Sequence, residues 1–441
     1  MYFLSIDFGT SSVKMSILDE KLDVKQTAKA EYPYILLPGE KVEIDPKALM
    51  GGLFQAAGQL DPSLRARVEA ICYDTFSPSP VLIAEDGRLA YPNIVTHMDR
   101  RSRAQCGYID RTFGKDNYLH IAGIYPFAGG AGIMTILWFQ QNQPEYLKKT
   151  DRIGHLTTYI HHELTGKWMV DLVNASMLGL YETTTQGGWS KTLLDAFQLE
   201  PRWFSEIRNP GTVFGELLPG IAEKLGVKAG VPVAVGTNDM ASAQAGAGNN
   251  EAGCIMDTAG SSDMVSILTD KPVVNPHYYL RNSALPGLWQ IYATTAGGFA
   301  VDWFYEQFCK DLDKKTFYGP YIEDCLNRFQ KDGEVTFDPY LTGDRQSMEK
   351  KTGAWRGLTL AATREEMLAA MLKSMNRVLN TTIREAAGVV SLKPVIKLTG
   401  GMSGEKYIRL KEREIPGFRF EVVENCSILG NVVLMQRYWN R

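Results

Sequence analysis

The sequence predicts an α/β protein of two lobes, each with a related core, that face a shared cleft. Its 441 residues are enough for roughly two to three domains. Strand-like and helix-like segments alternate along both halves, and one type of polar turn occurs once in each half. A glycine-rich stretch at residues 246–250 marks the boundary. It predicts an N-terminal lobe over residues 1–247 and a C-terminal lobe over residues 248–441.

The composition is that of an ordinary globular protein, with 44% hydrophobic and 22% charged residues. A net charge of −3 provides neither the basic excess of a nucleic-acid binder nor a polybasic patch for an acidic membrane surface. No apolar run approaches the ~18 residues that cross a bilayer, so we expect no membrane partner. The first residues lack the features of a signal peptide, and the six cysteines form no CxxC pair. These features predict a cytoplasmic protein with reduced thiols.

The first half opens with a strand, a polar turn and a second strand. Residues 3–6 are short and apolar, and residues 13–18 alternate apolar with polar side chains. A later hairpin is expected where residues 81–84 and 89–91 flank Asp86-Gly87, which is a strong turn signal. The other elements expected in this half are helices at 135–141 and 159–164 and a buried strand at 231–235.

The second half contains the clearest helix of the sequence. It is expected to begin at Thr363, with Glu366 three residues later in a capping box, and to end at Gly388. Its apolar stripe includes several methionines, which we interpret as core residues. A strand at residues 395–398 follows and leads into Thr399-Gly400-Gly401.

The polar turn of the first hairpin is repeated in the second half. Asp7 is followed by Ser11 and Ser12, and Asp257 is followed by Ser261 and Ser262 at the same spacing. Glycine lets the backbone approach a ligand, and successive N–H groups with serine and threonine hydroxyls can bind phosphate. The alternative is chance, because Asp, Gly and Ser are common in all turns.

Asp239 is the second candidate for chemistry. It follows the strand at residues 231–235 through Gly236-Thr237-Asn238, at the strand end where α/β folds place their ligands. A carboxylate there could act as a general base, although a helix N-cap is the commoner role of such an Asp. The sequence contains no GxxxxGK[ST] phosphate loop and no HExxH metal motif.

The order of these motifs resembles that of the FGGY carbohydrate kinases over nearly the whole chain. The stretch at residues 7–14 is similar to the first phosphate hairpin of that family, 236–239 to its catalytic-base turn, 258–262 to its second phosphate hairpin and 399–403 to its adenosine loop. Further similar stretches are 98–101, 136–138 with 144–145, 162–166, 171–176 and 340–345 with 356–358.

The resemblance implies two actin-like ATPase lobes of the ribonuclease H type, with ATP and a small sugar in the interlobe cleft. It implies that Asp239 is the general base and that Asp7 and Asp239 border a Mg²⁺ ion. A homodimer is compatible with the resemblance. The residues that it assigns to the nucleotide are Asp7, Gly9, Thr10, Ser11, Ser12, Lys14, Thr258, Gly260, Ser261, Gly400, Gly401 and Met402. Those that it assigns to the sugar are Asp74, Thr75, Asp99, Arg100, Asn238 and Asp239.

The acceptor sugar is expected to be a pentulose, either xylulose or ribulose. Xylulose kinases usually carry Met-His after the third strand and glycerol kinases carry Arg-Glu, whereas this chain has Ser77-Pro78. Asp74-Thr75 is closer to ribulokinase-like members. The alternatives are a kinase for another polyol, an aldonate or a heptulose, and a nucleotide switch of the actin or Hsp70-like type that needs no sugar pocket. A sugar-binding pseudokinase is a further alternative, against which the intact Asp7, Asp239 and Gly400-Gly401 argue.

Overall fold

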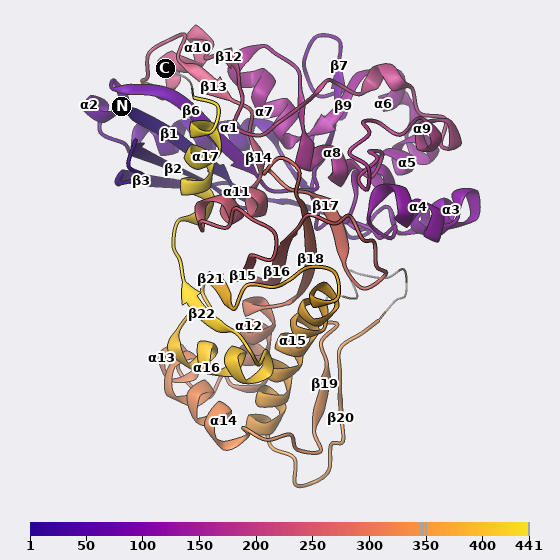
Figure 1. Ribbon diagram of the computed structural model, residues 1–441, viewed down its shortest axis with the longest axis vertical. Helices are drawn as coiled ribbons and strands as arrows, with labels where there is room; N and C mark the ends of the chain where they lie inside the picture. The colour runs from indigo at the N-terminus through magenta and orange to yellow at the C-terminus, as the bar shows by residue number, and fades with distance from the viewer. Residues whose placement is uncertain (342, 344–347, 349–350, 440–441) are drawn as a thin grey trace.

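The computed structural model, which describes residues 1–341, 343, 348 and 351–439, consists of two lobes stacked along the long axis of the molecule (Figure 1). The chain leaves the N-terminal lobe after α11 (Asp239–Gly246) and returns to it with α17 (Cys426–Gln436). None of the described helices is both long enough and apolar enough to cross a membrane.

The N-terminal lobe is built around a mixed sheet with the strand order β12-β13-β6-β1-β2-β3, and β14 also pairs with β6. Both faces of its first strand are buried. Ile6 packs in the cluster that includes α1, and Phe3 packs against Ile428 and Val432 of α17. The strands of this sheet are β1 (Tyr2–Phe8), β2 (Ser12–Asp19), β3 (Val24–Glu31), β6 (Val68–Thr75), β12 (Val213–Glu216), β13 (Pro232–Ala234) and β14 (Thr237–Asn238).

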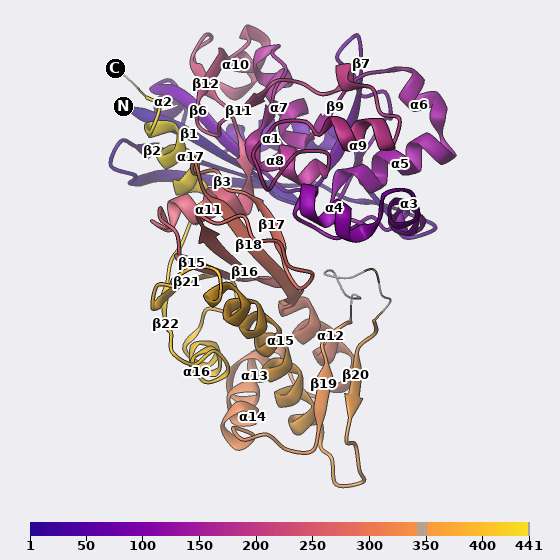
Figure 2. The same ribbon diagram turned by 45° about the vertical axis from the view of Figure 1, so that its right-hand side comes forward.

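The rest of this lobe is mainly helical and extends to one side of the sheet (Figure 2). Its helices and turns are α1 (Pro46–Gly58), α2 (Pro62–Arg65), α3 (Arg103–Phe113), α4 (Lys115–Ala122), α5 (Gly132–Asn142), α6 (Pro144–Lys148), α7 (Leu156–Thr165), α8 (Leu172–Leu178), α9 (Lys191–Ala196), η1 (Pro201–Trp203) and α10 (Pro219–Leu225). Its small strands are β4 (Ile35–Leu37), β5 (Lys41–Ile44), β7 (Pro80–Ala84), β8 (Ile94–Val95), β9 (Thr150–His155), β10 (Val170–Asp171) and β11 (Ile207–Arg208).

The hairpin expected around Asp86-Gly87 is only partly present. The turn forms, with Gly87 at φ +83°, but Leu89 makes a single bridge to Ile83 in place of a strand. The main partner of β7 is β9, which pairs with it antiparallel. Strand β7 therefore pairs mainly with a segment about seventy positions later in the sequence, and only through a single bridge with the segment after the turn.

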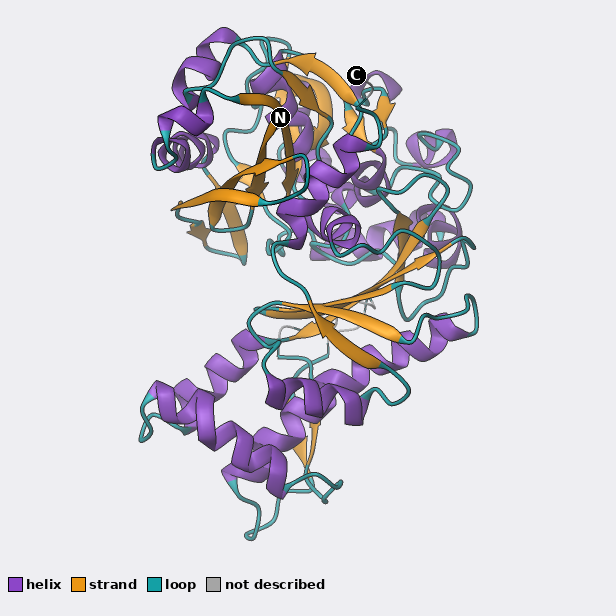
Figure 3. Ribbon diagram, turned by 60° about the vertical axis from the view of Figure 1, so that its left-hand side comes forward, coloured by secondary structure: helices purple, strands orange, loops and turns teal. Residues whose placement is uncertain are grey.

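The C-terminal lobe contains a second mixed sheet with the strand order β17-β18-β16-β15-β21-β22. Helices cover the face of this sheet that points away from the N-terminal lobe (Figure 3). Its elements are β15 (Ile255–Ala259), β16 (Ser262–Thr269), β17 (Tyr279–Asn282), β18 (Trp289–Ala296), α12 (Gly298–Phe308), α13 (Lys314–Thr316), η2 (Phe317–Tyr321), α14 (Ile322–Arg328), β19 (Thr336–Asp338), β20 (Ala354–Arg356), α15 (Arg364–Ala387), β21 (Val395–Thr399), α16 (Glu405–Glu414) and β22 (Arg419–Val422).

Helix α15 begins where the sequence predicts. The hydroxyl of Thr363 accepts a hydrogen bond from the backbone N–H of Glu366 at 3.3 Å, so Thr363 is the N-cap. The apolar stripe of the helix, including Met371 and Met375, is buried in the core of the lobe. The helix ends at Ala387, before Gly388.

The repeated turn of the sequence corresponds to a repeated unit of structure. In the first lobe β1 and β2 form an antiparallel hairpin and β6 lies parallel to β1. In the second lobe β15 and β16 form the equivalent hairpin and β21 lies parallel to β15. The α/β architecture of two related lobes is thereby confirmed.

The last helix departs from the predicted division at residue 247, because α17 packs on the N-terminal lobe (Figure 1). Ser5 of β1 donates a hydrogen bond to the backbone oxygen of Ile428 at 2.8 Å. Glycines allow α17 to lie very close to α11. A Cβ added at Gly430 would lie 1.8 Å from the backbone oxygen of Ser242, and one added at Gly246 would lie 1.9 Å from that of Cys426.

We therefore expect Gly430→Ala to destabilise the protein by about 2 kcal/mol or more, because backbone atoms on the facing helix leave no room for a methyl group. Gly51→Ala is the matched control, since Gly51 is an exposed residue of α1 whose added Cβ meets no atom within 4 Å. The control should be stabilised by up to ~1 kcal/mol, because alanine is the better helix former. Thermal unfolding of both variants measures the difference, and equal stabilities would contradict the close helix contact.

Candidate active site

A cavity of about 840 Å³ lies between the lobes, and both polar hairpins line it. The turn between β1 and β2 contributes Thr10 and Ser11. The turn between β15 and β16 contributes Gly260 and Ser261, preceded by Thr258 of β15. Asn238 and Asp239 line the same cavity. The two hairpins and the candidate base, which are far apart in sequence, therefore share one cleft.

Parallel strand pairing brings three carboxylates to one edge of the first sheet. Asp7 of β1 is the register partner of Asp74 of β6, and Asp74 is also the register partner of Thr237 of β14. Asp239 follows β14 directly. Because parallel strands end on the same side of a sheet, the register alone places these acidic side chains close together.

Asp239 has the properties of a general base. Its Oδ1 accepts hydrogen bonds from the backbone N–H of Met240 at 2.7 Å and from Nδ2 of Asn238 at 2.8 Å. Its Oδ2 makes no hydrogen bond with any residue that the structure describes. Burial, reinforced by the charge of Asp7, raises the pKa of Asp239 to about 6. The carboxylate is therefore basic enough to accept a proton and still mostly ionised at neutral pH.

A chain of polar side chains fixes the orientation of this carboxylate. The Nδ2 group of Asn238 donates to Asp239 and also to the hydroxyl of Ser77 at 3.1 Å, and that hydroxyl donates to Oδ1 of Asn174 at 2.7 Å. Asn174 in turn donates to the buried Asp171 at 2.7 Å. Asn238 is also the N-cap of α11, the role that the sequence left open for Asp239 itself.

The structure corrects the assignment of Asp74 and Thr75 to the sugar. Both side chains are fully buried, and neither lines the cavity. Asp74 accepts a hydrogen bond from Nδ2 of Asn431 on α17. Burial, together with the charges of Asp7 and Asp239, raises the pKa of Asp74 well above its usual range. Asp74 therefore has a structural position, beside Asp7 in the sheet and hydrogen-bonded to α17.

The loop assigned to the adenosine lies against the second hairpin. Gly400 has φ +106°, and an added Cβ would be 2.4 Å from the backbone oxygen of Ala259. The same oxygen accepts a hydrogen bond from the N–H of Met402 at 2.9 Å. Gly401 lines a separate hollow of about 360 Å³, together with Tyr318, Lys406 and Tyr407 among others. The Met402 side chain is instead buried in the core of the lobe.

Four residues assigned to the nucleotide, Asp7 among them, belong to the first hairpin but do not line the cavity. Gly9 and Ser12 flank the cavity residues Thr10 and Ser11. The Nζ group of Lys14 donates to Oδ1 of Asn425 at 2.7 Å, next to the start of α17. Its positive charge lowers the pKa of Asp7, opposing the dominant effect of burial, which raises it. Lys14 thus acts on the carboxylate edge and does not reach the cavity.

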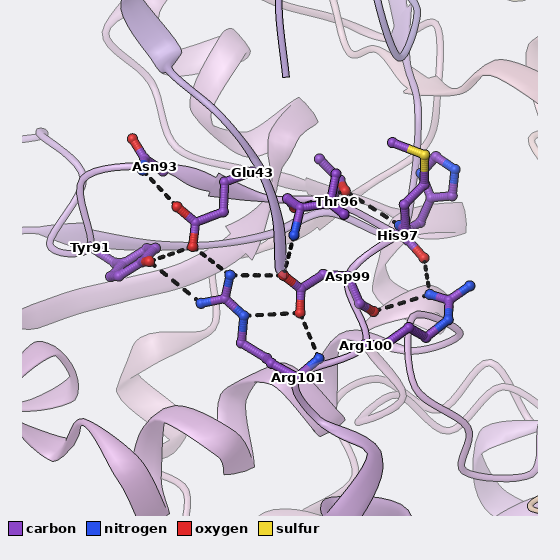
Figure 4. A network of polar contacts seen from close by, with 10 residues as sticks. Glu43, Tyr91, Asn93, Thr96, His97, Asp99, Arg100 and Arg101 are labelled. Carbon is purple, nitrogen blue, oxygen red and sulfur yellow. Dashed lines mark hydrogen bonds and ion pairs between the residues drawn. The ribbon is translucent and has the colours of Figure 1, made fainter. Parts of the chain in front are cut away.

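The structure also corrects the role of Asp99 (Figure 4). Arg101 binds both oxygens of Asp99, at 2.9 Å from Nε to Oδ1 and 2.8 Å from Nη2 to Oδ2, and it also pairs with Glu43. Oδ2 of Asp99 accepts a further bond from the N–H of Val42 at 2.8 Å. These buried partners occupy the carboxylate and hold the loop in place. In the same loop Arg100 does line the cavity, with its Nη1 bonded to backbone oxygens.

The opposite wall of the cavity was not found from the sequence. It is one face of the second sheet, to which β16, β17 and β18 contribute residues that point the same way. The wall residues are Met264, Tyr279, Arg281, Tyr292 and Thr294. The sequence feature that could have indicated this wall is Arg281, a charged residue that directly follows the apolar residues 278–280. Thr342, Asp344 and Arg345, which belong to the stretch 340–345 noted above, lie outside the described residues.

Asp7 and Asp239 have the chemistry that a Mg²⁺ ion requires. They are hard oxygen ligands, and like-charge repulsion from Asp7 contributes to the raised pKa of Asp239. Within the described part of the chain, no group of three or more His, Cys, Asp or Glu side chains could hold a metal ion. Because Mg²⁺ in phosphoryl-transfer sites is bound by one or two carboxylates plus substrate phosphates, the two aspartates fit an ion that arrives with the nucleotide.

Comparison with known proteins identifies the family. Residues 2–246, more than half of the chain, match the N-terminal domain of the FGGY family of carbohydrate kinases. A gluconokinase of Bacillus licheniformis is 24% identical over 85% of this chain and 74% of its own length, and a xylulose kinase of Lactococcus lactis subsp. lactis is 25% identical over 93% and 82%. The ligand-bound xylulose kinase from Lactobacillus acidophilus has the same fold, with a TM-score of 0.88, 19% identity and 99% and 89% of the two chains covered. The chain belongs to the FGGY family of carbohydrate kinases, which are phosphotransferases with an alcohol group as acceptor.

Proposed function

We propose that this kinase transfers the γ-phosphoryl group of ATP to a hydroxyl group of a small sugar bound in the interlobe cavity. The observation that carries the proposal is the position of Asp239. Its carboxyl group has a pKa of about 6 and one unbonded oxygen, and it lines the cavity to which both glycine- and serine-containing hairpins contribute. A nucleotide switch would need the hairpins but no base of this kind beside a cavity of about 840 Å³.

The reaction follows from this arrangement. Asp239 accepts the proton of the acceptor hydroxyl as its oxygen attacks the γ-phosphorus, the bond from that phosphorus to the bridging oxygen breaks, and ADP leaves. The N–H and hydroxyl groups of Thr10, Ser11, Gly260 and Ser261 would bind the phosphate oxygens. Catalysis is then mostly positioning and charge stabilisation.

The nucleoside would lie in the C-terminal lobe, in the hollow lined by Gly401 and Tyr318. Gly400 supports this placement, because its lack of a side chain lets the loop contact the strand that carries Thr258. Mg²⁺ would be held by Asp7 and Asp239, and when bound it would neutralise charge on the phosphates.

The acceptor class follows less directly. The sequence predicts a pentulose, xylulose or ribulose, and a xylulose kinase is among the relatives, but so is a gluconokinase. Asp74 and Thr75, which pointed toward ribulose, do not line the cavity, whereas Ser77 and Pro78 do. The chemistry of the cavity wall must therefore distinguish the acceptors. A homodimer and a cytoplasmic location stay predictions.

We expect Asp239→Asn to reduce acceptor-dependent ADP release by about 10²–10⁴-fold, because the amide cannot accept the hydroxyl proton. The shape of the site is kept, so the affinity for ATP should change by less than about tenfold. A coupled ADP assay and nucleotide titration measure the two effects. Asp195→Asn, at an exposed position of α9, is the matched control and should retain full activity. Near wild-type turnover of Asp239→Asn would refute the assignment of the base.

The rate should also depend on pH in a defined direction. Asp239 must be ionised to accept a proton, so kcat/KM should fall about tenfold per pH unit below the pKa and level off above it. The midpoint is expected at or below about pH 6, because a bound cation would lower the pKa of about 6 found without one. Initial rates between pH 5 and 8 measure this profile. A rate that increases as the pH falls through 6 would contradict a carboxylate base.

A further inference from the structure

The cavity wall contributed by the second sheet contains a buried arginine with no counter-ion among the residues that the structure describes. Arg281 lies in β17, its side chain is 6% exposed, and it lines the interlobe cavity. Arginine keeps its charge in proteins. A buried charge is costly unless it is paired, so an arginine in this position requires a partner.

The contacts of Arg281 hold its side chain but do not neutralise it. Nε donates to Oε1 of Gln290 at 3.2 Å, and Nη1 contacts the sulfur of Met177 at 3.4 Å, a weak acceptor. The guanidinium lies over the ring of Tyr292, with Cζ 4.2 Å from the ring centroid. Nη2 has no hydrogen-bond partner among the described residues. The guanidinium is therefore fixed in orientation, with one donor group unused.

No described carboxylate forms an ion pair with Arg281. The acidic group that acts on it is Asp239, whose charge opposes the effect of burial on the pKa of Arg281, but the two do not form a hydrogen bond. The other acidic residue lining the cavity, Glu40, is bound by Arg103 through two hydrogen bonds of 3.0 and 3.1 Å. The protein thus leaves this cationic position for an anion that enters the cavity.

We propose that Arg281 binds a carboxylate group of the acceptor, so that the enzyme phosphorylates a sugar acid of the aldonate class in preference to a neutral ketose or polyol. This inference rests on the proposed function, because it concerns the acceptor of that reaction. A guanidinium matches a carboxylate with two parallel donors, and a fixed orientation makes such recognition specific.

The position of Arg281 along the wall suits this role. It pairs with Gln290 across β17 and β18, while Ser262 at the second hairpin pairs with Ala296 of the same strand β18. The six residue steps from Gln290 to Ala296 span roughly 20 Å along the strand. This length accommodates a terminal phosphate at the hairpin, a hydroxyl near Asp239 and a carbon chain that ends in a carboxylate at Arg281. Thr294, whose hydroxyl has no partner among the described residues, lies between them and can bond the acceptor hydroxyls.

The first test compares acceptors that differ only in charge. ADP release is measured with D-gluconate and D-glucitol, with D-xylonate and xylitol, and with D-xylulose and D-ribulose. We expect kcat/KM for at least one aldonate to exceed that of its matched alditol by about 10- to 100-fold, the usual gain from a hydrogen bond to a charged group. A ketose or alditol that is used as well as the best aldonate would overturn the inference.

The second test removes the charge. Arg281→Met should lower kcat/KM for the aldonate by about 10- to 100-fold, mainly through KM, and bring the aldonate-to-alditol ratio toward one. Arg281→Lys should fall between wild type and Arg281→Met, because it keeps the charge but loses the fork. Arg88→Met removes an exposed arginine and is the control for net charge, so its ratio should not change. Equal losses for both acceptors in Arg281→Met would show a structural role and overturn the inference.

Binding without catalysis separates this inference from the proposed reaction. The aldonate alone should raise the melting temperature of the wild-type protein but not that of Arg281→Met, and the ligand-free variant should be at least as stable as wild type. If no acceptor is phosphorylated while this difference persists, phosphoryl transfer is refuted and the anion site stands. If the aldonate stabilises both proteins equally, or the ligand-free variant is strongly destabilised, the anion site is refuted.

Discussion

The parallel pairing of β1 with β6 is the constraint on which the site depends. It sets Asp7 beside Asp74, and the addition of β14 brings Asp239 to the same edge. Burial and mutual repulsion make it unfavourable for all three neighbouring carboxylates to be ionised at once. The pKa of the fully buried Asp74 is raised well above its usual range, whereas Asp239 lines the cavity, keeps an unbonded oxygen and has a pKa of about 6. Strand register and burial together therefore give Asp239 the properties required of the proposed general base.

The second lobe uses the same hairpin without the same chemistry. Asp257 has the sequence spacing of Asp7, but the strand register places Thr258, opposite Met264, where the first hairpin has Asp7 opposite Lys14. Lys411 of α16 lies 2.8 Å from Asp257 and 2.9 Å from Asp263. This buried cation is shared by the two carboxylates and ties α16 to the hairpin. The first copy of the hairpin thus contributes Asp7 to the carboxylate edge, whereas the second contributes Thr258, Gly260 and Ser261 to the cavity lining.

Residues of both lobes line the cavity, and residues of both lobes also hold its walls in position. From α17, Ser427 donates to Asp7 at 3.1 Å and Asn431 donates to Asp74, so the end of the chain stabilises the carboxylate edge of its beginning. On the opposite wall, Arg281 of the second lobe contacts Met177 of the first. A movement between the lobes would therefore change the distance between base, phosphate hairpins and Arg281 together. A movement that closed the cavity over an acceptor would also exclude water.

Patterns within single segments were enough to predict the local features: the two hairpins, the helix that begins at Thr363, the strand before Asp239 and the order of motifs that identifies the family. These depend on residue type, alternation and turn chemistry over a few positions. The tertiary structure decided which polar side chains reach the cavity. It buried Asp74 and Thr75, paired Asp99 with Arg101, returned α17 to the first lobe and placed Arg281 opposite Asp239. Those outcomes depend on the register and packing of segments up to several hundred residues apart, and no pattern within a single segment carries that information.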